Sequence, residues 1–178
     1  MLKKILISIS SLILACCMGY NVYTPEDHQR DIKMVKSGTI DPNLLGIWID
    51  ITIPNDPSDS TMLEIFRKDK VLNKQVFYNK KLKEFRCESS KFDVPNSFWS
   101  VKRKGYFHCV YGYLPPGRNV ISRLREKRYI IKDGILHTGN DSELYFRSKK
   151  LEDYDKEMYD KLLKTDLPCM NLSTIYSD

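Results

Sequence analysis

The sequence LGIWIDITI, residues 45–53, is rich in β-branched and aromatic side chains and is followed by a turn cluster that begins at Asn55. Such a stretch is typical of a β-strand. Similar short stretches recur along the chain, at residues 62–67, 71–78, 82–89, 98–104, 106–113, 120–131, 135–138 and 144–147. Asp133-Gly134 between two of them is a strong signal for a two-residue hairpin. Eight or nine strands without helical crossovers predict a mainly β fold, either a small antiparallel β-barrel or a sandwich.

A helix is predicted on each side of the strands. Thr24-Pro25-Glu26-Asp27 combines a capping threonine, a proline at the first helical position and acids in the first turn, and Gly38 is a plausible end. We expect His28 in this short helix to be solvated. After the last strand, Leu151, Tyr154, Met158 and Leu162 recur at helical spacing. They predict one C-terminal helix that packs outside the barrel; a helix that binds a partner is the alternative.

Gly46, Trp48 and Arg147 resemble a pattern of the lipocalin or calycin superfamily, in which a G-x-W motif begins the barrel. The resemblance implies a lipocalin-like barrel over residues 44–148. It also implies that Trp48 closes the base of the barrel while Arg147 packs across the indole as a cation–π pair. The strands are short for a classical lipocalin, which fits a small barrel with its interior filled by side chains.

The N-terminus reads as an export signal. Lys3 and Lys4 precede an apolar run of 11 residues, Ile5 to Ala15, which is too short for a membrane span of roughly 20 residues. Ile13-Leu14-Ala15-Cys16 resembles a bacterial lipobox, which implies cleavage after Ala15 and lipidation of Cys16. An ordinary secretory signal is the alternative.

The position after Cys16 holds Cys17 rather than aspartate, which by the same resemblance favours the outer membrane, on either of its faces. The predicted organisation is therefore a signal peptide (1–15), a lipid-anchored lead-in (16–43), a barrel with its C-terminal helix (44–164) and a tail (165–178).

The cysteines predict a disulfide, because exported cysteines are usually paired. Cys87 and Cys109 both lie in predicted strands, and they are the preferred pair. Cys169 could replace either partner. A metal site built from Cys87, Cys109 and His108 is a weaker alternative, since no CxxC or HxxxH spacing supports it, and we predict no metal.

The charge of the chain is mildly basic. Without residues 1–15, which contain two lysines and no acids, 27 basic and 23 acidic residues remain, a net charge of +4. This balance is not that of a dedicated nucleic-acid-binding protein. Several basic residues alternate along predicted strands and could share one face that binds an anionic partner: Lys102, Lys104, Arg123, Arg125 and Lys127. The other interpretation is that they form the solvated side of a sheet.

No catalytic motif accompanies the three histidines. We therefore expect a lipid-anchored outer-membrane protein, not an enzyme and without a cofactor, that binds a small apolar ligand or an envelope component. The alternative is an envelope assembly, interaction or inhibitor protein that uses the surface of a filled barrel. An enzyme that uses His108 or His137 is a third, weaker hypothesis.

Overall fold

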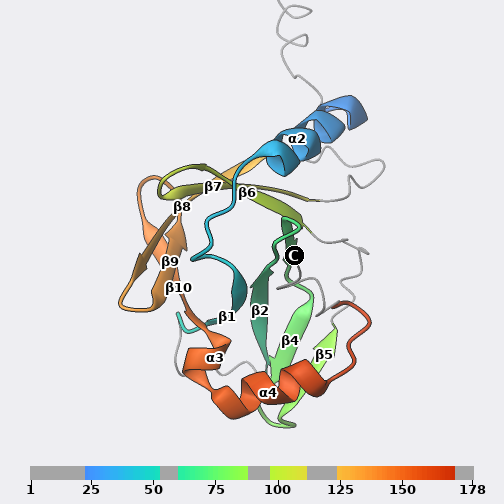
Figure 1. Ribbon diagram of the computed structural model, residues 1–178, viewed down its shortest axis with the longest axis vertical. Coiled ribbons are helices and arrows are strands. Elements are labelled where there is room, and N and C mark those ends of the chain that lie inside the picture. Colours follow the sequence, from blue (N-terminus) through green and yellow to red (C-terminus); the bar gives the residue numbers. More distant parts are fainter. Residues whose placement is uncertain (1–22, 53–59, 88–96, 112–123, 171–178) are drawn as a thin grey trace, which may run out of the picture.

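A computed structural model describes residues 23–52, 60–87, 97–111 and 124–170. Within these ranges the chain forms ten strands and three helices (Figure 1). The strands are β1 (Gly46–Asp50), β2 (Ser60–Phe66), β3 (Val71–Asn73), β4 (Val76–Asn79), β5 (Glu84–Cys87), β6 (Ser97–Arg103), β7 (Tyr106–Tyr111), β8 (Arg125–Lys132), β9 (Ile135–Gly139) and β10 (Leu144–Lys150). The helices are α2 (Pro25–Ser37), α3 (Leu151–Tyr154) and α4 (Lys156–Lys164).

Eight of the strands close into an antiparallel barrel, which confirms the predicted fold class. The order around the ring is β1-β10-β9-β8-β7-β6-β3-β2, and pairing between β1 and β2 closes it. Strand β4 also pairs with β2, after a break at Lys74 and Gln75, and β5 pairs with β4. The β4–β5 hairpin therefore extends from the barrel wall. The hairpin predicted at Asp133-Gly134 joins β8 to β9, with positive φ at both turn residues.

Side chains of β1 alternate between two hydrophobic cores. Trp48 faces the barrel interior, whereas Ile47 and Ile49 face outward. The interior core contains Leu44, Trp48, Phe66, Leu72, Trp99, Phe107, Tyr129 and Leu136. The outer core lies between the wall, the β4–β5 hairpin and the C-terminal segment, and contains Ile47, Ile49, Leu63, Ile65, Val76, Phe85, Leu151, Tyr159, Leu162, Leu167 and Met170. One strand thus joins two cores because its neighbouring side chains point to opposite faces.

Helix α2 forms where the sequence predicts it and crosses the outside of β6 and β7 (Figure 1). Thr24 and Asp27 form a reciprocal capping box, and Gly38 is the C-cap. The expectation that His28 is solvated is wrong, since His28 is buried. None of the helices in the described ranges has the length and apolar character that a membrane crossing requires.

The C-terminal segment packs outside the barrel as predicted, but as two helices rather than one. Asp155 has extended backbone angles (φ −155°, ψ 100°), which end α3, and its side chain caps α4 by accepting a hydrogen bond from the Met158 amide. Because of this break, Tyr154 leaves the apolar stripe and is half exposed, while Leu151, Tyr159 and Leu162 are buried.

The disulfide joins Cys87 to Cys169, so the preferred pair Cys87–Cys109 is wrong. The cause is the direction of the two strand cysteines. Cys87 faces the outer core, beside the C-terminal segment, whereas Cys109 faces the interior core and is a free thiol. Two cysteines on opposite faces of a sheet cannot reach each other. The bridge ties the segment after α4 to the β4–β5 hairpin.

Candidate binding site

The interior of the barrel holds a layer of fully buried aromatic side chains: Trp48, Phe66, Trp99 and Phe107. The ring of Phe66 meets those of Trp99 and Phe107 edge to face, with centroids 5.0 and 5.7 Å apart. Both indole N–H groups donate to backbone carbonyls, Trp48 to Leu44 at 2.8 Å and Trp99 to Arg67 at 3.2 Å. This aromatic layer is closely packed and its polar atoms are satisfied.

A second group of interior side chains is charged. Glu64 lies directly opposite Trp48 on the neighbouring strand, and Lys127 lies opposite Phe107. Because Trp48 and Phe107 face the interior, their cross-strand partners do so too. Lys74 follows β3 and forms an ion pair with Glu64. We call these three residues, Glu64, Lys74 and Lys127, the charged layer. The thiol of Cys109 lies beside them on the inward face.

Solvent reaches the charged layer but not the aromatic one. The side chains of Glu64 and Lys74 are 16% and 29% exposed, whereas Trp48 is 1% exposed and Trp99 is fully buried. The interior therefore combines packed apolar side chains with partly exposed charged ones. An interior of this kind is typical of ligand pockets, which combine apolar walls with a few polar groups.

The charges of this layer influence one another. Burial alone would raise the pKa of the Glu64 carboxyl, but Lys74 and Lys127 outweigh it and hold this pKa below its ordinary value. Burial and the neighbouring Lys74 lower the pKa of Lys127, while Glu64 partly opposes them. Burial raises the pKa of the Cys109 thiol, so this side chain is neutral at pH 7.

The charged layer contains one carboxylate and two ammonium groups. The Glu64 carboxylate is engaged by Lys74. Across the residues that the structure describes, the Lys127 ammonium has neither a hydrogen-bond nor an ion-pair partner, although it is close enough to Glu64 to change its pKa. A partly buried cation without a direct partner is costly for a fold, and such groups cluster at functional sites.

The structure reproduces only part of what the lipocalin resemblance implies for Gly46, Trp48 and Arg147. Gly46 opens β1 and Trp48 lies in the interior, as expected. The role expected for Arg147 is wrong, because Arg147 is paired with His137 on the outer face and is exposed. Lys150 takes its place: it lies opposite Trp48, with its Nζ 5.7 Å from the indole centroid.

The predicted anionic-partner face is divided by the wall of the barrel. Lys127 faces inward, as does Arg125, which lies opposite Cys109 and is exposed. Lys102 is on the outside, where its Nζ donates to Glu126 at 2.6 Å, and Lys104 lies in an exposed turn. Arg123 and the predicted lipidation site, Cys16, lie outside the described residues.

The alternative metal site does not assemble. His108 is on the outer face and is bonded to Glu126 at 3.0 Å, Cys109 points inward, and Cys87 is in the disulfide. No group of three or more potential metal ligands occurs among the residues that the structure describes.

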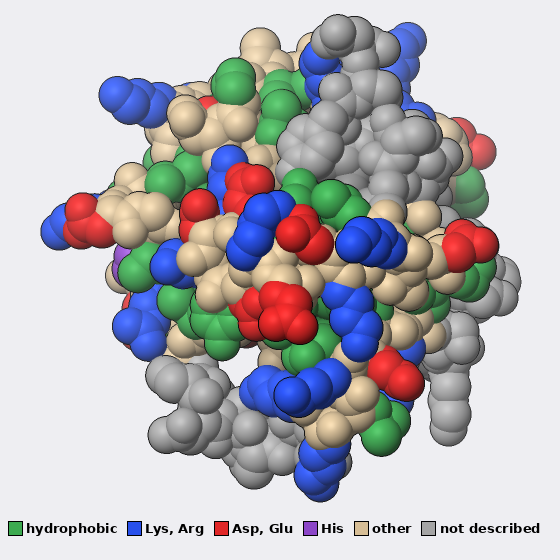
Figure 2. All heavy atoms as spheres, turned by 60° about the horizontal axis from the view of Figure 1, so that its bottom comes forward, with side chains coloured by type: hydrophobic (Ala, Val, Ile, Leu, Met, Phe, Trp, Pro, Cys, Tyr) green, Lys and Arg blue, Asp and Glu red, His purple; other side chains and the backbone are tan. Residues whose placement is uncertain are grey.

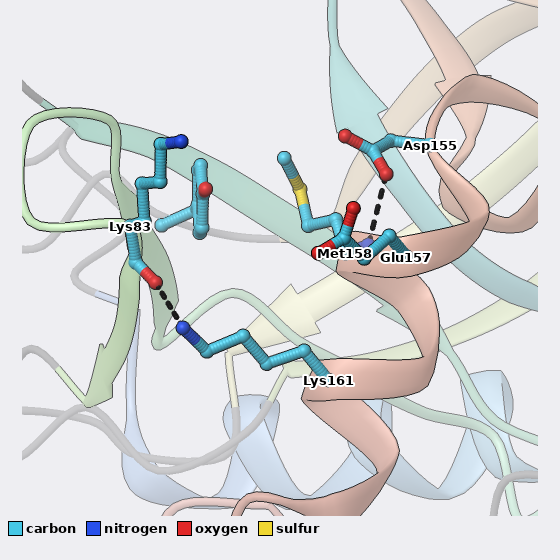
Figure 3. A pocket seen from close by; sticks show the side chains of 6 residues that line it. Lys83, Asp155, Glu157, Met158 and Lys161 are labelled. Carbon is cyan, nitrogen blue, oxygen red and sulfur yellow. Dashed lines mark hydrogen bonds between the residues drawn. The ribbon is translucent and has the colours of Figure 1, made fainter.

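A shallow pocket of about 160 Å³ lies outside the barrel, between the β4–β5 hairpin and α4 (Figure 3). The Lys161 ammonium donates across it to the Lys83 carbonyl at 2.6 Å. Its charged lining is balanced, with two acids and two lysines: Asp155, Glu157, Lys83 and Lys161. Figure 2 shows acidic and basic side chains intermixed over the described part of one face of the molecule. The pocket is therefore a weaker candidate than the charged layer.

No protein-family model, curated protein or solved structure matches this chain.

Proposed function

We propose that this chain is a lipid-anchored binding protein of the bacterial outer membrane, without catalytic activity, that takes up a small, largely apolar ligand inside its barrel. The observation that carries the proposal is the layered interior. Packed aromatic side chains lie next to partly exposed charged ones, and among the residues that the structure describes the Lys127 ammonium has no hydrogen-bond or ion-pair partner. An interior that served packing alone would gain more stability from apolar side chains than from this charged layer.

The uptake of a ligand is tested with phenylnaphthylamine, an uncharged probe whose fluorescence rises in apolar surroundings. We expect saturable binding of one probe per chain. The variant Cys109→Phe fills interior space beside the charged layer and should abolish binding. The matched control Ile130→Phe adds bulk on the outer face of β8, where Ile130 is already exposed, and should bind as the wild type does. Binding that survives Cys109→Phe in a folded protein would contradict uptake into the barrel.

The anchor is tested by the intact mass of the mature protein extracted with detergent. We expect the mass of residues 16–178 plus a diacylglycerol and one further acyl chain, because stable membrane attachment needs more than one chain. Cys16→Ser should abolish the lipid mass and release the protein from the membrane fraction. A wild-type mass without lipid would contradict the anchor.

A second candidate is an interaction protein that uses the barrel surface. It is favoured by two neighbouring rings on β10, Tyr145 and Phe146, which are each 43% exposed and have centroids 4.7 Å apart, although the register directs Phe146 to the inward face. Exposed aromatic side chains are enriched at protein interfaces. Crosslinking from a photoreactive residue at position 145 to an envelope protein, lost in Phe146→Ser, would support this function over ligand uptake.

A further inference from the structure

We infer that the ligand carries a single anionic group, such as a carboxylate, sulfonate or phosphate ester, and that Lys127 and Lys74 bind this group within the barrel. The inference rests on the proposed function and adds the chemical class of the ligand. It starts from the charge balance of the charged layer.

The strand register places the two lysines around the same interior zone. Lys127 faces inward between Arg125 and Tyr129 on β8, since Tyr129 belongs to the interior core. Lys74 reaches the zone from the break between β3 and β4. Glu64 feels both ammonium groups, because both contribute to the low pKa of its carboxyl. The three side chains therefore lie within electrostatic reach of one another.

The charge balance selects the sign of the ligand. One carboxylate faces two ammonium groups, so the layer has a net charge of one positive unit when all three are ionised. A cationic ligand would meet net repulsion there. A neutral ligand would cover Lys127 without compensating its charge, which is unfavourable in a dry interior.

A ligand with one negative charge balances the net charge of Glu64, Lys74 and Lys127. Its anionic group can accept hydrogen bonds from Lys127 while Lys74 keeps its bond to Glu64, and its apolar part can contact the aromatic layer. Hydrogen bonds between charged partners are about twice as strong as neutral ones. The neutral thiol of Cys109 adds no competing charge.

The test compares two fluorescent probes with the same ring system, anilinonaphthalene sulfonate and its uncharged parent phenylnaphthylamine. The full chain with Cys16→Ser is used, so that no anchor lipid or detergent competes for the probes. We expect the sulfonate to bind about tenfold more tightly than the parent, as a charged hydrogen bond warrants. Lys127→Met should remove this preference, because the sulfonate loses its cationic partner and the parent no longer covers an uncompensated charge. Lys127→Arg should retain the preference.

The matched control is Lys132→Met, which removes an exposed lysine from the outer side of the same strand and should alter neither affinity. Cooperative thermal unfolding confirms that each variant is folded. A measurement on the unaltered site is independent of any folding defect: sodium chloride should weaken sulfonate binding but not binding of the parent.

The outcomes separate the two proposals. Equal affinities for the two probes, or a preference that persists in folded Lys127→Met, would overturn the anionic class while ligand uptake stands. Saturable binding of neither probe would overturn ligand uptake and the inference with it. Both proposals are supported if the wild type prefers the sulfonate and Lys127→Met is the only lysine variant that loses this preference.

Discussion

Trp48 and Lys150 lie opposite each other on β1 and β10, and the lysine Nζ is 5.7 Å from the centroid of the indole. The arginine expected at this place, Arg147, is an odd number of residues away along β10 and therefore faces outward. The cation that lies against Trp48 therefore comes from a different residue of β10 than the resemblance to lipocalins implies.

The contact predicts unequal effects of two substitutions. Lys150→Met should lower the free energy of unfolding by about 0.5–1 kcal/mol, the usual value of a partly exposed cation–π pair. Arg147→Met should change it by less than about 0.5 kcal/mol, as exposed surface substitutions do. Urea denaturation followed by tryptophan fluorescence measures both. If Arg147→Met lowered the free energy of unfolding more than Lys150→Met, the contact between Arg147 and Trp48 that the lipocalin resemblance implies would be supported instead.

The disulfide Cys87–Cys169 should stabilise the fold strongly, because it spans a sequence separation of 82 residues. The chain-entropy relation gives about 4.5 kcal/mol for such a loop. Cys169→Ser should lower the free energy of unfolding by most of this amount. Dithiothreitol should then no longer change the stability of this variant. Cys109→Ala is the control, since its bridge stays intact and its stability should still fall on reduction. If Cys109→Ala instead removed the response to dithiothreitol, the bridge would involve Cys109.

His28 should make the fold less stable in mild acid. Its ring is buried, and Nε2 has no hydrogen-bond partner among the residues that the structure describes. Nδ1 lies 3.3 Å from the Tyr23 hydroxyl, whose proton is donated to Asp31. Burial lowers the pKa of His28, although Asp31 partly opposes this. Above about pH 6.5 the imidazole is neutral in both the folded and the unfolded chain. As the pH falls below that value, the unfolded chain takes up the proton first, so the stability decreases.

The measurement is the free energy of unfolding by urea at pH 7.5 and at pH 5.5, and it should be lower at the more acidic pH. His28→Gln should reduce this difference between the two conditions. His137→Gln, which replaces an outward-facing histidine of β9, should leave the difference as in the wild type. An unchanged pH dependence in His28→Gln would exclude His28 as its source.

Gly38 allows α2 to lie close to the barrel. A Cβ at this position would overlap the Ser100 hydroxyl and lie 2.7 Å from the Ser100 Cβ on β6. Gly38→Ala should therefore destabilise the protein by about 1–3 kcal/mol, the usual cost of overpacking. The double variant Gly38→Ala, Ser100→Gly should recover part of this loss in thermal unfolding. Additive effects of the two substitutions would show that the contact is not the cause.

The charged residues of the candidate site show why the sequence pattern does not reveal which strand side chains face the barrel interior. Glu64 stands between Leu63 and Ile65 in β2, and this alternation is the signal that it faces opposite to them. Polar residues that alternate with apolar ones are normally assigned to the solvent side of a sheet. Here both faces of β2 are covered, one by the outer core and one by the barrel interior. Arg125 and Lys127 were likewise expected on one solvated surface, but their register on β8 directs them to the inward face of the barrel.

Local physical chemistry determined the elements of this protein from sequence alone. The capping box at Thr24 and Asp27, the Asp133-Gly134 turn and the β-branched stretch around Trp48 each act over a few residues, and the structure contains all three. The tertiary structure decided which face of each strand is inside, and with it the partner of Cys87, the cation beside Trp48 and the inward direction of Lys127. These depend on strand register and ring closure, which bring together residues that no local interaction connects.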